Sequence, residues 1–322
     1  YHSYHGATPG AMAFTGDFRR WPTERVNYTV GGVRFAPDCY CYRCPFNMEY
    51  PQCGVQCAKY LDYMIKEEGN VAAIIMEPIV GSNGRLVPPP EYYPMVREIC
   101  DENNVLMIAD EVMTGWFRTG PTFAMENWNV QPDIMTTAKG CTSAYTPVGI
   151  TMTTDRVADY FEDEFFCHGH TYAYHALALA AIPPAVSEYK KLMESGLPQK
   201  VATYLKERIH ELAERHDCVG DVRGMGHFYG LELVKNRETK EPFNVKADKI
   251  DGKPLMAAKI GGDAMANGLW VQSWYDALMI APPLITTEEQ IDAAFTILDK
   301  SLAIGDAEAV KTGIAVSRSS EF

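Results

Sequence analysis

The sequence predicts an α/β fold, with a doubly wound, mainly parallel sheet in a large domain and a smaller α+β domain after it. Residues 71–79 and 105–109 are continuous apolar runs, which are typical of parallel strands buried on both faces. Between them, residues 91–104 carry apolar side chains at helical spacing. Shorter β-rich runs follow at 133–137 and 148–154. Strands that alternate with helices through short connections predict right-handed crossovers.

The character of the sequence changes near residue 190. The stretch 227–234 alternates like a half-exposed strand, and Thr286 with Glu289 fits a capping box at the start of a last helix. Two further stretches carry apolar residues at helical spacing and predict amphipathic helices. The first stripe consists of Val201, Tyr204, Leu205, Ile209 and Leu212, and the second of Ile291, Phe295, Leu298 and Leu302. We therefore expect a large domain over 1–190, a small domain over 191–310 and a frayed tail over 311–322.

Composition limits the possible partners. The chain has 322 residues and a formal net charge of −13, which repels phosphate backbones and argues against nucleic acid. No run reaches the roughly 18–20 apolar residues of a membrane span, and no secretion signal is visible. We expect a cytoplasmic protein with reduced cysteines. Because the chain opens at Tyr1 inside a motif-like stretch, we also expect that an N-terminal part is missing.

Five of the nine cysteines lie close together in the sequence, at Cys39, Cys41, Cys44, Cys53 and Cys57. Their spacing lacks the two separated C-x2-C pairs of a zinc site. Aromatic residues and Pro45 stand between them, as in a packed loop. A metal site remains an alternative, but we expect no stoichiometric metal here.

Three polar residues follow predicted strands: Glu77, Asp110 and Lys139. Each has an ordinary explanation, respectively an ion pair, a helix N-cap and a solvated loop lysine. Ligands of doubly wound sheets gather at the carboxyl ends of strands, so three such residues in succession indicate a site. Lys139 has no acidic neighbour in its segment, so it is either a solvated surface lysine or a nucleophile that is kept partly desolvated.

Asp110 and Val112 are two residues apart, so in a strand they would share one face, with Glu111 on the other. An acid beside a small apolar side chain suits a flat heteroaromatic ring. The acid would hold a ring N–H, and Val112 would pack on the ring's face.

At this point the motifs match a family. The ordered set "YHG", "EPI.G", "ADEV.TG..RTG", "TTAKG", "HGHTY", "VRG.G" and "APPL" resembles the class III (ω-) aminotransferases, from Tyr1 to about Leu302. The resemblance implies the fold type I architecture of pyridoxal-phosphate transferases. It implies pyridoxal 5'-phosphate as cofactor and a homodimer whose active sites are shared between subunits.

The resemblance also assigns roles to individual residues. Lys139 would form the Schiff base with the cofactor, and the same amine would carry the proton of the substrate carbon. This proton transfer requires a protonated ring nitrogen, which Asp110 would hold in that state. The family's phosphate-binding cup lies upstream of "YHG", before this chain begins. Tyr4 and Val112 would pack on the two faces of the cofactor ring, with His5 beside them. Thr171 would bind the phosphate of the cofactor in the neighbouring subunit. Glu77 would lie in the active site without touching the cofactor.

The substrate expectation rests on a departure from the family. Pyruvate-using members place an arginine in the strand before "APPL", and equal spacing puts Gln272 there. Glutamine lacks the charge and the bidentate fork, so Arg19, Arg20 or a residue of the missing part must supply the cation. This favours a donor with a terminal acid and no α-carboxylate, taurine above all, with pyruvate as acceptor. β-Alanine, 4-aminobutyrate and diamines are the alternative donors.

A hypothesis from a different class of enzyme is that the protein is a metal-dependent hydrolase. The segment "CHGHTYAYH" offers Cys167, His168, His170 and His175, and an H-x-H pair could combine with Asp110. Lys139 would then have no chemical role.

Overall fold

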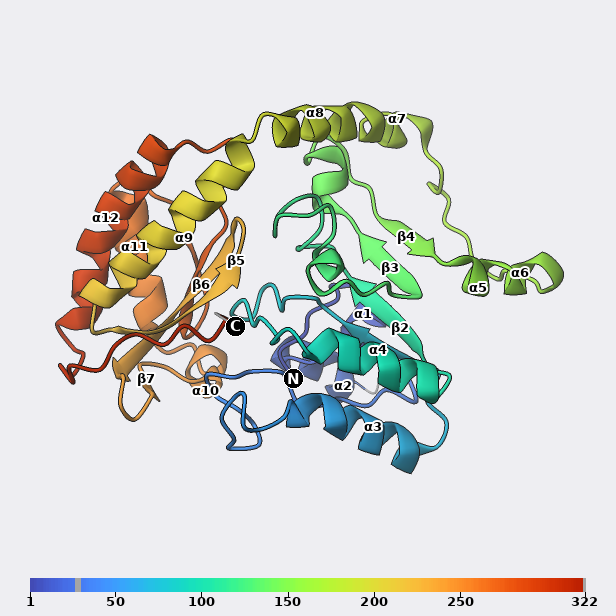
Figure 1. Cartoon of the computed structure of the whole chain (residues 1–322), viewed down its shortest axis with the longest axis horizontal. Helices are drawn as coiled ribbons and strands as arrows, with labels where there is room; N and C mark the ends of the chain where they lie inside the picture. The colour runs from blue at the N-terminus through green and yellow to red at the C-terminus, as the bar shows by residue number, and fades with distance from the viewer. Residues whose placement is uncertain (27–29, 321–322) are drawn as a thin grey trace. The chain divides into compact units, whose positions relative to one another are not determined.

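The computed structural model describes residues 1–26 and 30–320, and the chain divides into two compact units (Figure 1). The first unit holds residues 1–39, 44–79 and 88–195. The second unit holds residues 196–322 together with two short stretches from the first half of the chain, 40–43 and 80–87. None of the helices in the described part of the chain is long and apolar enough to cross a membrane.

The first unit is built around a four-stranded sheet with the order β1-β2-β3-β4. Strands β1, β2 and β3 run parallel, and β4 is antiparallel to β3. This confirms the predicted mainly parallel α/β sheet. Its elements are α1 (Pro9–Phe14), η1 (Phe18–Arg20), α2 (Trp21–Arg25), α3 (Gln56–Glu68), β1 (Ala73–Met76), α4 (Tyr92–Glu102), β2 (Leu106–Asp110), η2 (Ala124–Trp128), β3 (Ile134–Thr137), η3 (Lys139–Thr142), β4 (Ile150–Thr153), α5 (Asp155–Ala158), α6 (Tyr160–Asp163), α7 (Ala176–Leu179) and α8 (Ile182–Glu194).

Helix α4 is the crossover between the parallel strands β1 and β2. It buries Val96, Ile99 and Cys100, as the helical spacing predicts, and it packs against β2. The expectation of full burial is wrong for β1, whose residues are all half-buried, and for alternate residues of β2, where Leu106 and Ile108 are half-buried. The reason is that the helices of this unit cover the faces of the sheet only in part, since even β3, which has a strand on each side, is mostly half-buried.

After β4 the chain leaves the sheet. Figure 1 shows the segment with α5 and α6 running away from β4 before it returns to α7 and α8. Large apolar side chains are exposed along this segment, among them Phe165 at 85% and Tyr174 at 89%. Exposed aromatic clusters of this kind mark interaction surfaces in soluble proteins.

The second unit packs helices on an antiparallel sheet with the order β5-β6-β9-β8 and β7 beside β6. The predicted stripes are buried, except that Tyr204 is only partly covered. Fully burying one such side chain contributes roughly 1.5–3 kcal/mol, so these stripes account for much of the packing. The elements are α9 (Leu197–Arg215), β5 (Val219–Met225), β6 (Phe228–Asn236), β7 (Glu241–Pro242), α10 (Lys246–Ile250), α11 (Met256–Ala266), β8 (Gln272–Ser273), β9 (Ala277–Ile280) and α12 (Glu288–Asp306).

Strand β6 is buried on both faces from Phe228 to Val234, so the expectation of a half-exposed strand is wrong. Tyr229, Leu231 and Leu233 face the helical core. The alternate residues meet the stretches 40–43 and 80–87, where Val234 packs with Tyr40, Tyr42 and Leu86. Two segments distant in sequence therefore cover the face that alternation assigned to solvent.

A buried charged cluster lies on that second face. Arg223 forms ion pairs with Asp221, at 2.8 Å, and with Glu232, which also binds Tyr40 and Arg43. Removing one partner of such a pair leaves a buried charge uncompensated, which typically costs about 3–5 kcal/mol. The cluster therefore ties the stretch 40–43 to β5 and β6.

Two further expectations need correction. The cap of α12 is Thr287 with Gln290: the Thr287 hydroxyl accepts from the Gln290 N–H, and the Gln290 side chain accepts from the Thr287 N–H. Thr286 instead donates its backbone N–H to Pro283. The tail is not frayed around Ser317, which bridges to Asp221 in parallel. Backbone pairing to β5 holds it there.

Candidate active site

The carboxyl ends of the three parallel strands bring Glu77, Asp110 and Lys139 to one edge of the first unit's sheet. Met76, the last residue of β1, is paired with Ala109 of β2, and Asp110 is paired with Thr136 of β3. Glu77 directly follows β1, Asp110 ends β2, and Lys139 comes two residues after β3. Parallel register therefore sets these three side chains at the same sheet edge.

Asp110 is buried and held from two sides. One carboxylate oxygen lies 2.8 Å from Nδ1 of His5, and the other accepts the backbone N–H of Val112 at 3.1 Å. The side chains of His5 and Asp110 are only 4% and 7% exposed. The carboxylate thus has a fixed orientation in a region with little water.

The expected shared strand face of Asp110 and Val112 is wrong, because β2 ends at Asp110. The two residues are instead joined by a turn that the Asp110 side chain closes. As expected, the Glu111 side chain points away from that of Asp110. Its carboxylate accepts hydrogen bonds from the Thr114 hydroxyl and the Met125 N–H. Burial raises the pKa of Glu111, although both hydrogen bonds act against the rise.

Tyr4 lies at the same edge. Its backbone N–H donates to Glu77 at 2.8 Å, and the phenol of Tyr93 donates to the carbonyl oxygen of Glu77 at 2.8 Å. The Arg19 guanidinium lies over the Tyr4 ring, 3.8 Å from its centroid, and pairs with Asp17. The segment that carries Tyr4 and His5 is thus attached to β1 through Glu77 and to β2 through Asp110.

Lys139 begins the short helix η3 with a φ of 45°. A left-handed backbone at a residue other than glycine is uncommon, and such strain collects at functional sites. Helix α8 packs against η3. Lys139 itself is exposed, so the expectation of a desolvated amine is wrong for the single chain. The reason is that η3 starts beyond the edge of the sheet.

Gly140 explains part of the "AKG" motif. A Cβ at this position would lie 2.6 Å from Cβ of Trp116, which is closer than side chains approach. Trp116 comes from the loop after Asp110 and donates its indole N–H to Thr137 at 2.9 Å. The loop after β2 therefore packs directly against the residue that follows the lysine. Sequence reasoning missed Trp116, although a glycine directly after a strand-end lysine was a signal of close approach.

Other candidate residues lie elsewhere. The Arg20 side chain binds Glu24 and the Gly16 carbonyl and stacks on Phe35. Gln272 belongs to the second unit, in β8, where it is paired with Met279. Thr171 is exposed, in the segment between α6 and α7.

The histidines of the metal-hydrolase reading do not join Asp110 in a cluster. His168 and His170 contact one another edge to face, and His175 caps α7 through Nδ1. Within residues 1–26 and 30–320, no three His, Cys, Asp or Glu side chains are placed to hold a metal ion. The absence of a metal at the five clustered cysteines stays a prediction.

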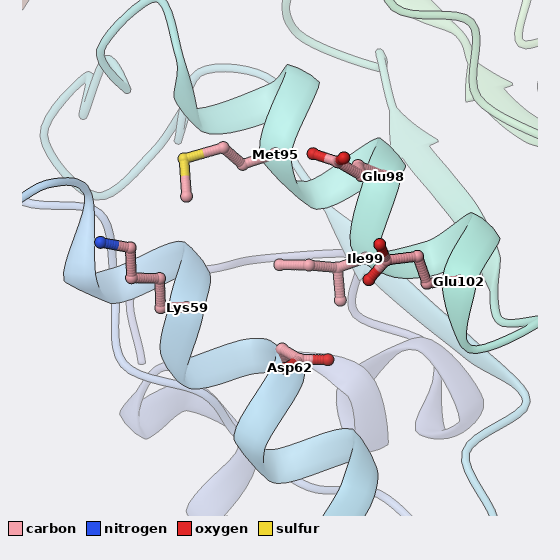
Figure 2. Close-up of a pocket in the computed structure, with 6 residues that line it drawn as sticks. All are labelled: Lys59, Asp62, Met95, Glu98, Ile99 and Glu102. Carbon is pink, nitrogen blue, oxygen red and sulfur yellow. The ribbon is translucent and has the colours of Figure 1, made fainter.

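A surface groove of about 280 Å³ lies between α3 and α4 (Figure 2). Its polar lining consists of three carboxylates and one ammonium, from Asp62, Glu98, Glu102 and Lys59. Such a lining disfavours anionic substrates, and the groove is formed by helix surfaces rather than strand ends. We do not assign it to the site.

The arrangement fits one class of cofactor. A buried, oriented carboxylate can hold a proton on a ring nitrogen, an aromatic ring can pack on a flat cofactor, and a strand-end lysine can bond to an aldehyde. Asp110, Tyr4 and Lys139 supply these groups. A buried carboxylate, an aromatic ring and a strand-end lysine on an α/β sheet are the groups expected of a pyridoxal-phosphate site of fold type I.

Comparison with known proteins gives the family. The model of the class-III aminotransferases matches residues 1–302, and the chain belongs to this pyridoxal-phosphate-dependent family. It is 38% identical to the taurine–pyruvate aminotransferase of Bilophila wadsworthia, over 92% of this chain and 66% of that protein. It is 35% identical to the adenosylmethionine-8-amino-7-oxononanoate aminotransferase of Geobacter sulfurreducens, over 93% of this chain and 66% of that protein.

A solved structure is also similar. It is the taurine:2-oxoglutarate aminotransferase of Bifidobacterium kashiwanohense in complex with pyridoxal phosphate and glutamate. The TM-score is 0.86 at 36% identity, covering 96% of this chain and 69% of that one. The chain spans about two thirds of the length of the curated relatives it matches, at 66%.

Proposed function

We propose that the protein is an aminotransferase that moves an amino group from an ω-amino acid or amino sulfonate to pyruvate. Taurine is the favoured donor, and pyridoxal phosphate bonded to Lys139 is the cofactor. The observation that carries this proposal is the buried contact between His5 and Asp110, beside Tyr4 and next to the strand that leads to Lys139.

The chemistry follows from what each side chain can do. Pyridoxal phosphate, when bound, supplies the electron sink for the charge left as the substrate carbon loses its proton. Asp110 holds the proton on the ring nitrogen, and His5 fixes the orientation of that carboxylate. Tyr4 and Val112 would pack against the ring of the cofactor. Nζ of Lys139 takes the proton from the amine-bearing carbon of the substrate.

The proposed donor rests on charge. Gln272 stands where pyruvate-using relatives are expected to have arginine, so this position offers hydrogen bonds without a charge. Taurine carries its sulfonate two carbons from the amine, and its reacting carbon has no acid group. Two similar proteins are described as taurine aminotransferases, which supports the same donor. β-Alanine, 4-aminobutyrate and diamines remain the alternatives.

The donor is tested with the purified full-length protein and pyridoxal phosphate. We expect taurine to bleach the visible absorbance of the bound cofactor and, with pyruvate, to yield alanine. The same panel includes β-alanine, 4-aminobutyrate, putrescine and an α-amino acid. If only a diamine or an α-amino acid bleaches the absorbance, the donor is wrong while the aminotransferase proposal survives.

Arg19 is the proposed cation for the sulfonate, because it lies against Tyr4. Charge-assisted bonds contribute roughly 1.5–3 kcal/mol, so Arg19→Gln should raise the KM for taurine by about 10- to 100-fold. Arg20→Gln is the matched control, since the Arg20 guanidinium lies over Phe35 and not over Tyr4. Equal KM values in the two variants would remove Arg19 from this role. Steady-state kinetics with taurine varied at saturating pyruvate provides the measurement.

We also propose a cytoplasmic homodimer with shared active sites. The exposed aromatic side chains after β4 offer an apolar surface for a second subunit, and exposed Thr171 lies within the same segment.

A further inference from the structure

The segment that carries Tyr4 and His5 is held by two parts of the first unit. The first contact comes from the end of β1, where the Glu77 carboxylate accepts the backbone N–H of Tyr4 at 2.8 Å. The second comes from the residues that follow α1. There the N–H of Gly16 donates to both the carbonyl oxygen and the hydroxyl of Ser3, each at 3.0 Å. The backbone of the segment therefore has partners in two different elements.

Thr15 makes the contact to the backbone of His5. Its hydroxyl oxygen accepts the His5 N–H at 3.1 Å, and the same hydroxyl donates to the carbonyl oxygen of Ala11 at 3.2 Å. Thr15 is the C-cap residue of α1, and the Ala11 carbonyl is one of the last four of that helix, which have no intrahelical partner. One hydroxyl thus joins the end of α1 to His5 as donor and acceptor at once.

This contact lies in the interior of the unit. Thr15 is completely buried, at 0% exposure, and the His5 side chain is 4% exposed. Because little water reaches the contact, solvent cannot take the place of the hydroxyl if it is removed. A buried N–H that loses its acceptor is destabilising, so the chain would shift to find another. The position of the His5 backbone should therefore depend on this hydroxyl.

The His5 backbone in turn sets the position of the imidazole. Nδ1 of His5 lies 2.8 Å from the Asp110 carboxylate. Hydrogen bonds between nitrogen and oxygen keep to a narrow range of distances, about 2.7–3.2 Å, so a small displacement of the backbone would weaken or misalign this one. Asp110 is the group proposed to hold the proton on the cofactor ring, and the inference rests on that proposed role.

We propose that Thr15 is a positioning residue of the active site. Its hydroxyl fixes the backbone of His5, His5 orients the carboxylate of Asp110, and Asp110 acts on the ring of the cofactor. The effect is transmitted through Asp110 rather than through the amine donor. Loss of the hydroxyl should therefore lower kcat and leave the KM for the donor nearly unchanged.

A pair of variants separates the hydroxyl from the packing of the side chain. Thr15→Val removes the hydroxyl at nearly constant volume, whereas Thr15→Ser keeps it. We expect Thr15→Val to lower kcat by about 10-fold, the effect of one hydrogen bond, and to change the absorbance spectrum of the bound cofactor. Thr15→Ser should retain both. The matched control is Thr8→Val, because the Thr8 hydroxyl accepts the Ala11 N–H at the opposite end of α1. This control should lower Tm without altering kcat or the spectrum.

Protein labelled with ¹⁵N at its eight histidines provides a readout that requires neither cofactor nor turnover. The signals of His5 are assigned by their loss in His5→Asn. In the unaltered protein we expect slow exchange of the His5 backbone N–H with solvent and a proton on Nδ1 of its ring. Thr15→Val should accelerate that exchange and shift the Nδ1 resonance, whereas Thr15→Ser and Thr8→Val should change neither.

Unchanged His5 signals together with an unchanged kcat in Thr15→Val would overturn the proposal. So would a Thr15→Ser variant that behaves like the valine variant, because packing rather than the hydroxyl would then be responsible. If Thr15→Val folds poorly, the unaltered protein answers the question, since fast exchange of the His5 backbone N–H would contradict its bond to Thr15. Shifted His5 signals in a protein without aminotransferase turnover would support the contact and refute the proposed function instead.

Discussion

Replacing Lys139 by methionine should reduce aminotransferase turnover by a factor on the order of 10⁴ or more, the largest loss of any single substitution. The amine is proposed both to bond to the cofactor and to move the substrate proton, and methionine has no amine to do either. The fold should survive, because Lys139 is exposed and its neighbours keep their contacts. Turnover and circular dichroism of the same sample provide the measurement.

A second experiment on the unaltered protein identifies the lysine directly. Borohydride reduction in the presence of pyridoxal phosphate, followed by peptide mapping, should place the pyridoxyl mass on Lys139. A label on a different lysine would refute the assignment, and so would retained turnover in the methionine variant. Lys191, an exposed lysine paired with Glu188 on α8, is a suitable control for unspecific labelling.

Asp110→Asn should keep the fold and lose turnover by about 10³-fold or more, a barrier increase of at least ~4 kcal/mol. Asparagine has nearly the same shape, but its amide cannot hold a proton on the ring nitrogen. The contact with His5 at 2.8 Å places the lost charge in a buried setting, where its effect is largest.

The control for this substitution is His5→Asn, which leaves the Asp110 carboxylate in place and removes its partner. Because His5 is proposed to act through Asp110, we expect a smaller loss of turnover and a changed absorbance spectrum of the bound cofactor. Near-normal turnover in Asp110→Asn would remove Asp110 from its role, even if the His5 variant were impaired. Single-turnover kinetics with taurine separates the two variants.

The sequence was sufficient to predict the elements whose burial pattern is local. The stripes of α9 and α12 and the strand ends at Glu77 and Asp110 follow from side-chain periodicity, which the chain carries within a few residues. The same locality predicted α4 between its two parallel strands. The strand ends then indicated where candidate site residues should be sought.

What the sequence could not predict are contacts between distant segments. His5 and Asp110 are 105 positions apart, and Tyr40 lies 192 positions from Glu232. No local pattern indicates that residues 40–43 cover the second face of β6. The alternation of apolar and polar residues in this strand therefore led to the wrong prediction that one face is exposed. The Thr286 cap was off by one position because neighbouring threonines offer the same hydroxyl.

The close approach of Gly140 to Trp116 means that these two positions cannot vary independently. A side chain added at 140 would push against the indole, and the displaced loop begins at the carboxylate of Asp110. The effects of such substitutions on stability should be non-additive. A larger side chain at position 140 should destabilise the protein, and a smaller residue at position 116 should partly restore its stability. Substitution of Trp116 alone would therefore also alter the packing of the segment that carries Lys139. For protein engineering, the pair is best treated as one unit and varied together.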